Sequence, residues 1–110
     1  MTTHAVAAPA EVQPGAMLRV VVDGRAICTY NVDGAFYATD DACTHRRARL
    51  SDGYLEGRVV QCPLHFGRFD VITGQPLNKP CTIALGVYAV AREGDALLLT
   101  VPPADADAGT

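Results

Sequence analysis

Two short stretches of the chain each place a cysteine close to a histidine. The first is Cys43-Thr44-His45 and the second is Cys62-Pro63-Leu64-His65, with sixteen residues between His45 and Cys62. Thiolate sulfur and imidazole nitrogen are strong ligands for transition metals. Turn residues lie beside both stretches, which places them in loops rather than inside strands. Two loops that each supply one sulfur and one nitrogen could grip a single metal centre, so Cys43, His45, Cys62 and His65 are the candidate ligands.

The other two cysteines and the third histidine do not share this pattern. Cys28 lies in a predicted strand, Cys81 follows Pro80, and neither has a histidine nearby in the sequence. A cysteine without such a neighbour is commonly a small buried hydrophobic residue. We therefore expect both to be structural and leave them, together with His4 near the N-terminus, outside the metal site.

The choice of metal is decided only in part by the ligand types. Two cysteines and two histidines also make a tetrahedral structural zinc site. Zinc fingers generally group the two cysteines on one loop and the two histidines on another, whereas here each loop supplies one of each. Mixed loops suit a two-iron cluster in which one iron takes both thiolates and the other takes both imidazoles. A zinc-stabilised binding module remains the alternative.

The elements that must position these loops are short strands. Glycine and proline, 10 and 7 residues respectively, interrupt the chain too often for a clear long helix. Asp23-Gly24 and Asp33-Gly34 lie between apolar runs, and Asp-Gly is the strongest short hairpin signal. The pattern predicts an all-β domain of antiparallel sheets in a sandwich or barrel-like arrangement, with strands at residues 18–22, 25–31, 35–38, 54–55, 58–61, 68–72, 87–91 and 96–101.

Length and composition limit the classes of protein. The 110 residues, 49% apolar and 19% charged, fit one compact domain and exclude a disordered chain. We expect this domain to span residues 11–103, with a flexible N-terminal segment at 1–10 and a flexible C-terminal tail at 104–110, because both ends lack periodicity. A net charge of −3 does not suggest a nucleic-acid partner.

The expected cellular location rests on the lack of two sequence features, a membrane-spanning run and a secretory signal. No apolar run is long enough to cross a membrane, and no basic residue precedes the alanine-rich N-terminus as in a secretory signal. We therefore expect a cytoplasmic protein without a membrane partner. Four cysteines in such a chain are more typical of metal ligands or thiols than of disulfides.

The order C-x-H, sixteen residues, C-x-x-H resembles the Rieske [2Fe–2S] signature. The wider stretch 43–73, including Leu50-Ser51-Asp52-Gly53 and residues 62–70, is similar to the small Rieske ferredoxins of bacterial aromatic ring-hydroxylating dioxygenase systems. The strand and turn pattern extends the match over roughly residues 12–102. The resemblance implies a Rieske fold with a cluster-binding subdomain of two loops. It also implies one [2Fe–2S] cluster, with Cys43 and Cys62 on one iron and His45 and His65 on the other.

The same resemblance implies a function. It is that of a soluble one-electron carrier, not an enzyme, between an NAD(P)H-dependent flavoprotein reductase and the terminal oxygenase. Oxygenase subunits fuse a Rieske domain to a much larger domain that holds a mononuclear iron, for which 110 residues leave no room. The small Rieske-like subunit of an assimilatory nitrite reductase is the alternative.

Departures from related families carry information about the reduction potential. High-potential Rieske proteins of respiratory complexes have an extra cysteine in each ligand loop, where this chain has Ala48 and Leu64. They also have a serine and a tyrosine whose hydroxyls bond to sulfur, where this chain has Gly67 and Phe69. We therefore expect no disulfide and a potential near the low end of the Rieske span of about −150 to +300 mV. Pro80 lies where the family places a proline-containing loop over the cluster.

Glycine and arginine residues surround the ligand loops. Gly53 and Gly67 allow either tight turns or close approach of the backbone to the cluster. Arginines accumulate here although the chain is acidic overall; they are Arg46, Arg47, Arg49 and Arg68. They form either a solvated rim of charge or a surface that steers docking to an acidic patch on a redox partner.

Overall fold

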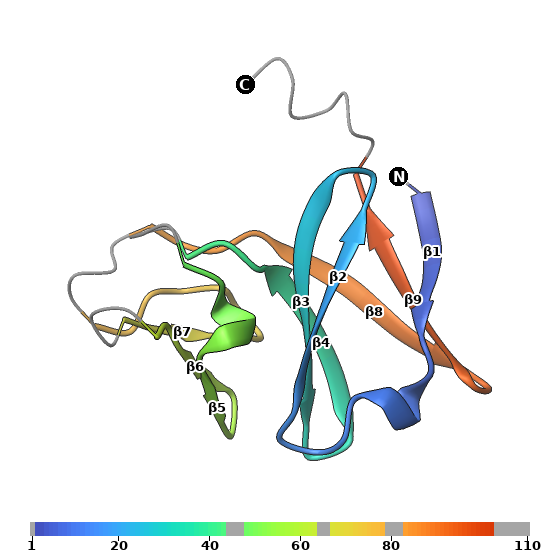
Figure 1. Cartoon of the computed structure of the whole chain (residues 1–110), viewed down its shortest axis with the longest axis horizontal. Helices are drawn as coiled ribbons and strands as arrows, with labels where there is room; N and C mark the ends of the chain where they lie inside the picture. Colours follow the sequence, from blue (N-terminus) through green and yellow to red (C-terminus); the bar gives the residue numbers. More distant parts are fainter. Residues whose placement is uncertain (1, 44–47, 64–66, 79–82, 103–110) are drawn as a thin grey trace.

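The computed structural model describes residues 2–43, 48–63, 67–78 and 83–102. In this part the chain forms β-strands and two 3₁₀ turns, and no α-helix (Figure 1). The strands are β1 (Thr2–Ala7), β2 (Met17–Val22), β3 (Arg25–Val32), β4 (Ala35–Asp40), β5 (Tyr54–Glu56), β6 (Val59–Gln61), β7 (Arg68–Asp70), β8 (Val87–Glu93) and β9 (Ala96–Val101). The 3₁₀ turns are η1 (Pro9–Glu11) and η2 (Leu50–Asp52). Within the described ranges, no helix has the length and apolar character needed to span a membrane.

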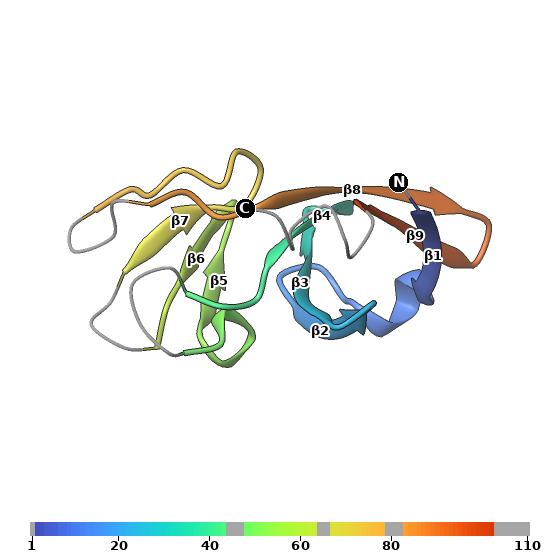
Figure 2. The same ribbon diagram turned by 90° about the horizontal axis from the view of Figure 1, so that it is seen from above.

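The strands form two antiparallel sheets. One has the order β1-β9-β8-β4-β3-β2, and the other has the order β5-β6-β7. The larger sheet curls, so that its two edge strands approach each other (Figure 2). His4 on β1 and Asp23 after β2 span this seam, with 3.5 Å between Nε2 and Oδ2. The smaller sheet stands beside the curled one, and the predicted all-β, barrel-like fold is confirmed.

Two Asp-Gly turns set the hairpins that join β2, β3 and β4. Both central residues of each turn have positive φ, namely 51° and 80° at Asp23 and Gly24 and 52° and 91° at Asp33 and Gly34. A turn with two positive φ angles matches the right-handed twist of the flanking strands, and Asp-Gly adopts it readily. The predicted hairpins are therefore confirmed, together with their turn positions.

Strand β3 connects two hydrophobic cores, because both of its faces are covered. Its residues from Ile27 to Asn31 are all buried. Ile27 belongs to a core shared by β2, β3, β4 and β9, whereas Cys28 and Tyr30 belong to a second core that includes side chains of the small sheet. The buried members of this second core are Cys28, Tyr30, Cys43, Leu50, Val60, Cys62, Phe69, Val71 and Leu85. Through β3 the two sheets form one domain.

The N-terminal segment differs from the sequence prediction. Residues 2–7 form β1, which pairs with β9 from Thr2 opposite Val101 to Ala7 opposite Leu97, with a shift in register between Ala5 and Ala7. These residues were expected to belong to a flexible segment, whereas the structure places them in a paired strand. The strand adds to the edge of β9 through backbone pairing, and its Val6 packs against the core of β2, β3, β4 and β9. The expected flexible tail at 104–110 lies outside the described residues.

Candidate metal centre

The first ligand loop, residues 43–48, closes on itself. Its first residue, Cys43, donates its backbone N–H to the carbonyl of Ala48 over 3.0 Å. Just outside this contact, Ala42 and Arg49 form an antiparallel bridge. The chain therefore leaves the end of β4, forms the loop and returns to the point where it began.

The second ligand loop, residues 62–67, has the same construction. Cys62 donates its backbone N–H to the carbonyl of Gly67 over 2.7 Å, and Gln61 pairs with Arg68 just outside. In both loops the cysteine bonds to the carbonyl five residues later, inside a pair of bridged residues. The two loops are thus structurally equivalent around Cys43 and Cys62.

Both loop cysteines reach the same hydrophobic core. Cys43 is 6% exposed, Cys62 is fully buried, and both lie in the core that also holds Leu50 and Phe69. Two buried sulfurs, one from each self-closed loop, fit a group that takes one thiolate from each. His45 and His65 lie outside the described residues. In the described ranges alone, no group of three or more His, Cys, Asp or Glu side chains is gathered, so the four-residue ligand set stays a prediction.

Gly53 allows η2, which follows the first loop, to lie against β6, which precedes the second loop. A Cβ atom at Gly53 would lie 2.0 Å from the carbonyl oxygen of Gln61, the residue before Cys62. This glycine follows η2 directly, and Tyr54 after it pairs with Gln61. The close approach found at Gly53 is to the backbone of β6; an approach to the cluster, the role given to Gly53 above, stays a prediction.

A buried carboxylate holds the base of the first loop. Asp41 is 1% exposed, and its Oδ1 accepts the backbone N–H of Ser51 over 2.9 Å. Its Oδ2 accepts the Nε–H of Arg19 over 3.1 Å, which balances its charge. Its backbone carbonyl accepts the N–H of Leu50 over 2.7 Å. Sequence reasoning missed this residue, since nothing in the pattern separates Asp41 from Asp40 beside it.

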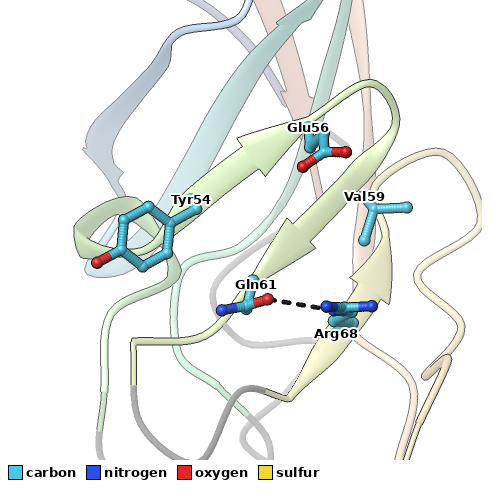
Figure 3. Close-up of a pocket in the computed structure, with 5 residues that line it drawn as sticks. All are labelled: Tyr54, Glu56, Val59, Gln61 and Arg68. Atoms are coloured by element: carbon cyan, nitrogen blue, oxygen red, sulfur yellow. Dashed lines mark hydrogen bonds between the residues drawn. The ribbon is translucent and has the colours of Figure 1, made fainter.

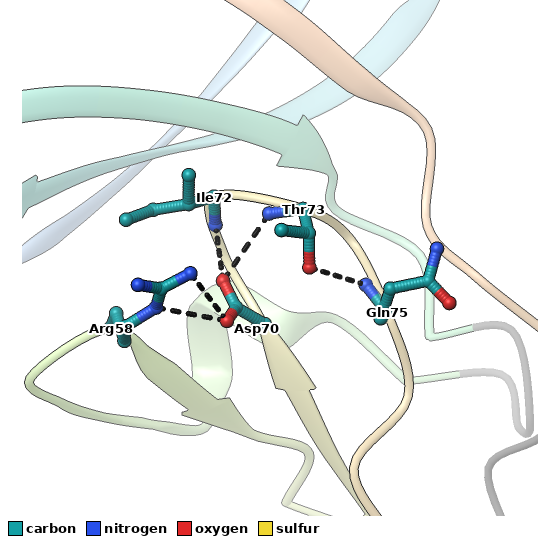
Figure 4. A network of polar contacts seen from close by, with 5 residues as sticks. All are labelled: Arg58, Asp70, Ile72, Thr73 and Gln75. Carbon is teal, nitrogen blue, oxygen red and sulfur yellow. Dashed lines mark hydrogen bonds and ion pairs between the residues drawn. The ribbon is translucent and has the colours of Figure 1, made fainter.

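A second carboxylate fixes the turn that follows β7 (Figure 4). Asp70 Oδ2 accepts hydrogen bonds from Arg58, at 2.9 Å to Nε and 2.8 Å to Nη2. Its Oδ1 accepts the backbone N–H groups of Ile72 and Thr73, at 2.8 and 3.2 Å. Burial acts to raise the pKa of Asp70, but the bonds from Arg58 and the two N–H groups outweigh it and hold the pKa below its ordinary value.

Asp70→Asn is expected to destabilise the protein by about 1–2 kcal/mol at neutral pH, because the charge-assisted bonds to Arg58 are lost. A carboxylate whose pKa is lower in the folded state stabilises that state above its unfolded pKa, here near 3.8. The contribution is lost as pH falls through the folded value. Urea unfolding of wild type and variant should therefore begin to converge below about pH 4 and coincide only below the lowered pKa of the folded state. The exposed Asp95→Asn is the control, and a difference independent of pH would contradict the assignment.

The segment after this turn runs beside the second ligand loop. Arg68 donates its backbone N–H to Asn78 Oδ1 over 2.8 Å, and Leu77 donates its N–H to the Arg68 carbonyl over 2.9 Å. The chain is thus held against β7 as far as Asn78. Pro80, predicted to cover the cluster, and Cys81 lie outside the described residues.

Cys28 is fully buried in the same core as the loop cysteines. Burial, opposed in part by a hydrogen bond from Tyr30, raises the pKa of its thiol to about 12. The thiolate is the form that binds metals, so Cys28 stays protonated as a core residue. The expectation that it is a small buried side chain is confirmed.

Comparison with known proteins is consistent with this construction. Residues 2–89 match the family model described as Rieske [2Fe-2S] domain. The ferredoxin component of the naphthalene 1,2-dioxygenase system of Pseudomonas aeruginosa is 48% identical over 81% of this chain and 86% of its own length. The family match and the 48% identity favour a dioxygenase ferredoxin over the two alternatives, a nitrite reductase subunit and a zinc-stabilised module.

Solved structures show the same relationship. A ferredoxin of Sphingomonas yanoikuyae B1 superposes with a TM-score of 0.87 and 35% identity, covering 92% of this chain and all of the other. The complex of reduced oxygenase and oxidised ferredoxin in carbazole 1,9a-dioxygenase contains a chain with a TM-score of 0.84 and 42% identity, covering 88% and 91%. The protein therefore belongs to the Rieske [2Fe–2S] family, among the ferredoxin components of aromatic dioxygenase systems.

Proposed function

We propose that this ferredoxin carries single electrons in the cytoplasm from an NAD(P)H-dependent flavoprotein reductase to the terminal oxygenase of an aromatic ring-hydroxylating dioxygenase. The observation that carries the proposal is the pair of equivalent, self-closed loops that begin at the buried residues Cys43 and Cys62. The oxygenase partner is supported by the carbazole 1,9a-dioxygenase complex, in which a similar ferredoxin accompanies its oxygenase. The reducing cytoplasm suits a site that depends on thiolates.

Within this proposal, Cys43 and Cys62 bind one iron and His45 and His65 bind the other. When bound, the [2Fe–2S] cluster supplies a one-electron redox couple, with a potential raised by neutral imidazoles in place of two thiolates. The protein contributes the dry surroundings of the two sulfurs and the closed loops that hold them. Asp41 supports the first loop by accepting the backbone N–H of Ser51, and the missing side chain of Gly53 leaves room for the Gln61 carbonyl next to the second loop.

Reconstitution tests this function directly. The protein, purified with ample iron, is expected to be red-brown and to contain acid-labile sulfide. With NADH, a flavoprotein reductase and the terminal oxygenase of a naphthalene 1,2-dioxygenase system, it should be required for reduction of the oxygenase. A colourless zinc protein, or an oxygenase that is reduced equally well without it, would refute the proposal.

Gly67→Ser is expected to raise the reduction potential. Gly67 is buried, and its carbonyl closes the second loop by accepting the N–H of Cys62. Related high-potential proteins have serine at this position, and a hydroxyl that donates to cluster sulfur favours the more negatively charged reduced state. Voltammetry of the serine variant is compared with Gly67→Ala, which adds the same Cβ without a donor. Equal potentials for the two variants would show that the hydroxyl does not reach sulfur.

A further inference from the structure

Each ligand loop is followed directly by an exposed arginine in an equivalent position. Arg49 follows the first loop and bridges to Ala42, and Arg68 follows the second loop and pairs with Gln61. Both arginines lie six residues after the loop cysteine. The matching backbone construction therefore places one cation at the base of each loop.

Each arginine also borders a hollow in the surface. Beside the first loop, Arg49 shares a hollow with Arg19 and the small side chains of Ala26, Ala42 and Ala48, above the buried Asp41. Beside the second loop, Arg68 lines a hollow on the outer face of the small sheet (Figure 3). An acidic side chain from a partner could enter either hollow and meet a guanidinium.

The side chains that line the hollow of the small sheet change in charge from one end of the hollow to the other. Tyr54, Gln61 and Arg68 lie across the three strands in the row next to the ligand loop, whereas Glu56 and Val59 lie in the next row, toward the turn. Arg68 Nε donates to Gln61 Oε1 over 3.1 Å, as Figure 3 shows, which orients the guanidinium across the sheet. Tyr54 is 65% exposed at the other end of its row. The end of the hollow nearest the loop is thus cationic and aromatic, and such side chains are enriched at protein interfaces.

Charge is distributed unevenly along the chain. Residues 43–70 contain five arginines and three acidic residues, a formal charge of +2, whereas the rest of the chain carries −5. Near the loops, two arginines are neutralised by ion pairs: Arg19 pairs with Asp41, and Arg58 pairs with Asp70. The remaining acids of residues 43–70 are Asp52 and Glu56. Against these two stand Arg46, Arg47, Arg49 and Arg68.

We propose that Arg49 and Arg68 form a basic docking surface for carboxylates of the terminal oxygenase. The inference rests on the proposed function and names the chemistry of the partner surface. A guanidinium binds a carboxylate through paired N–H groups, so the two equivalent arginines can fix the orientation of the partner as well as attract it. The overall charge of −3 would by itself repel an acidic partner, but the local charge at the loops reverses this effect.

Small charged oxidants test the surface without a protein partner. The reduced holoprotein is mixed with ferricyanide, an anion, or with tris(phenanthroline)cobalt(III), a cation, from about 10 to about 500 mM ionic strength. The rate with ferricyanide is expected to fall as salt rises, although both reactants carry net negative charge. The rate with the cobalt complex should rise. A ferricyanide rate that rises with salt would overturn the proposal.

Single charge reversals locate the surface. Arg49→Glu and Arg68→Glu are each expected to lower the ferricyanide rate at low salt by about three- to tenfold. Arg92→Glu is the matched control. Arg92 is exposed near the end of β8, and Figure 1 shows that this strand runs away from the small sheet. All three variants have the same net charge, so equal effects would contradict a local surface.

The oxygenase itself provides the second readout. Its Kd for the oxidised ferredoxin, measured by calorimetry, should rise about tenfold for Arg49→Glu and for Arg68→Glu, and should stay unchanged for Arg92→Glu. Unchanged Kd values for all three variants would overturn the assignment to the oxygenase. A wild-type protein that never reduces the oxygenase refutes the proposed function, whereas the ferricyanide salt dependence tests the basic surface separately.

Discussion

Gly53→Ala is expected to separate the two ligand loops and to cost the protein most of its cluster. The added Cβ would lie 2.0 Å from the Gln61 carbonyl oxygen and 3.2 Å from the Leu50 carbonyl oxygen. Both are backbone atoms, so no side chain can rotate away to make room. Relief requires η2 to move away from β6, which breaks the pairing of Tyr54 with Gln61 and moves the start of the second loop. We expect destabilisation by about 3 kcal/mol.

The matched control lies in the same hairpin. Gly57, in the turn between β5 and β6, has a φ of 58°, and a Cβ there would meet nothing within 4 Å. Gly57→Ala therefore introduces backbone strain of about 1 kcal/mol without a collision, whereas Gly53→Ala introduces a collision without a positive φ. Urea unfolding and the iron and sulfide content of both variants separate the effects. If the Gly53 variant kept the full cluster and stability of wild type, the close approach would not position the loops.

The sequence was sufficient for the elements whose signal is local. Asp-Gly turns define the hairpins around β3, and the predicted strands correspond to β2 through β9. Strand β1 was missed because its evidence is the free edge of β9, almost the whole chain away in sequence. The same limit applies to the order of the strands: nothing near β4 in the sequence indicates that β8 lies beside it.

For the candidate site, too, some residues could be predicted from the sequence and others could not. The spacing of Cys43 and Cys62 from their histidines predicts the metal centre, because cysteine and histidine are few in this chain, and the structure places the two cysteines in one core. The supporting contacts could not be predicted. Asp41 is important because of what surrounds it in three dimensions, namely Arg19 and the backbone of Ser51. Gly53 was noticed, but only the structure shows that its neighbour is Gln61.

Cys62→Ser is expected to abolish the cluster, whereas Cys28→Ser should retain it. Both cysteines are fully buried in the same core, so each substitution places a hydroxyl in similar apolar surroundings, at a cost of about 1–3 kcal/mol. That cost is shared by the two variants. They differ in chemistry: Cys62 begins a ligand loop, while burial keeps the thiol of Cys28 protonated, with a pKa near 12. Only the first variant removes a proposed ligand.

Measurement of apo and holo forms together separates folding from ligation. In the absence of iron, both serine variants should unfold at similar urea concentrations. After reconstitution, iron and acid-labile sulfide should fall at least about tenfold in Cys62→Ser and remain at the wild-type level in Cys28→Ser. Cys43→Ser should match the Cys62 variant, because both cysteines are buried and close their loops through the same backbone hydrogen bond. Retention of sulfide by Cys62→Ser, or its loss from a folded Cys28→Ser, would show that the cluster takes its sulfur ligands from a different pair of cysteines.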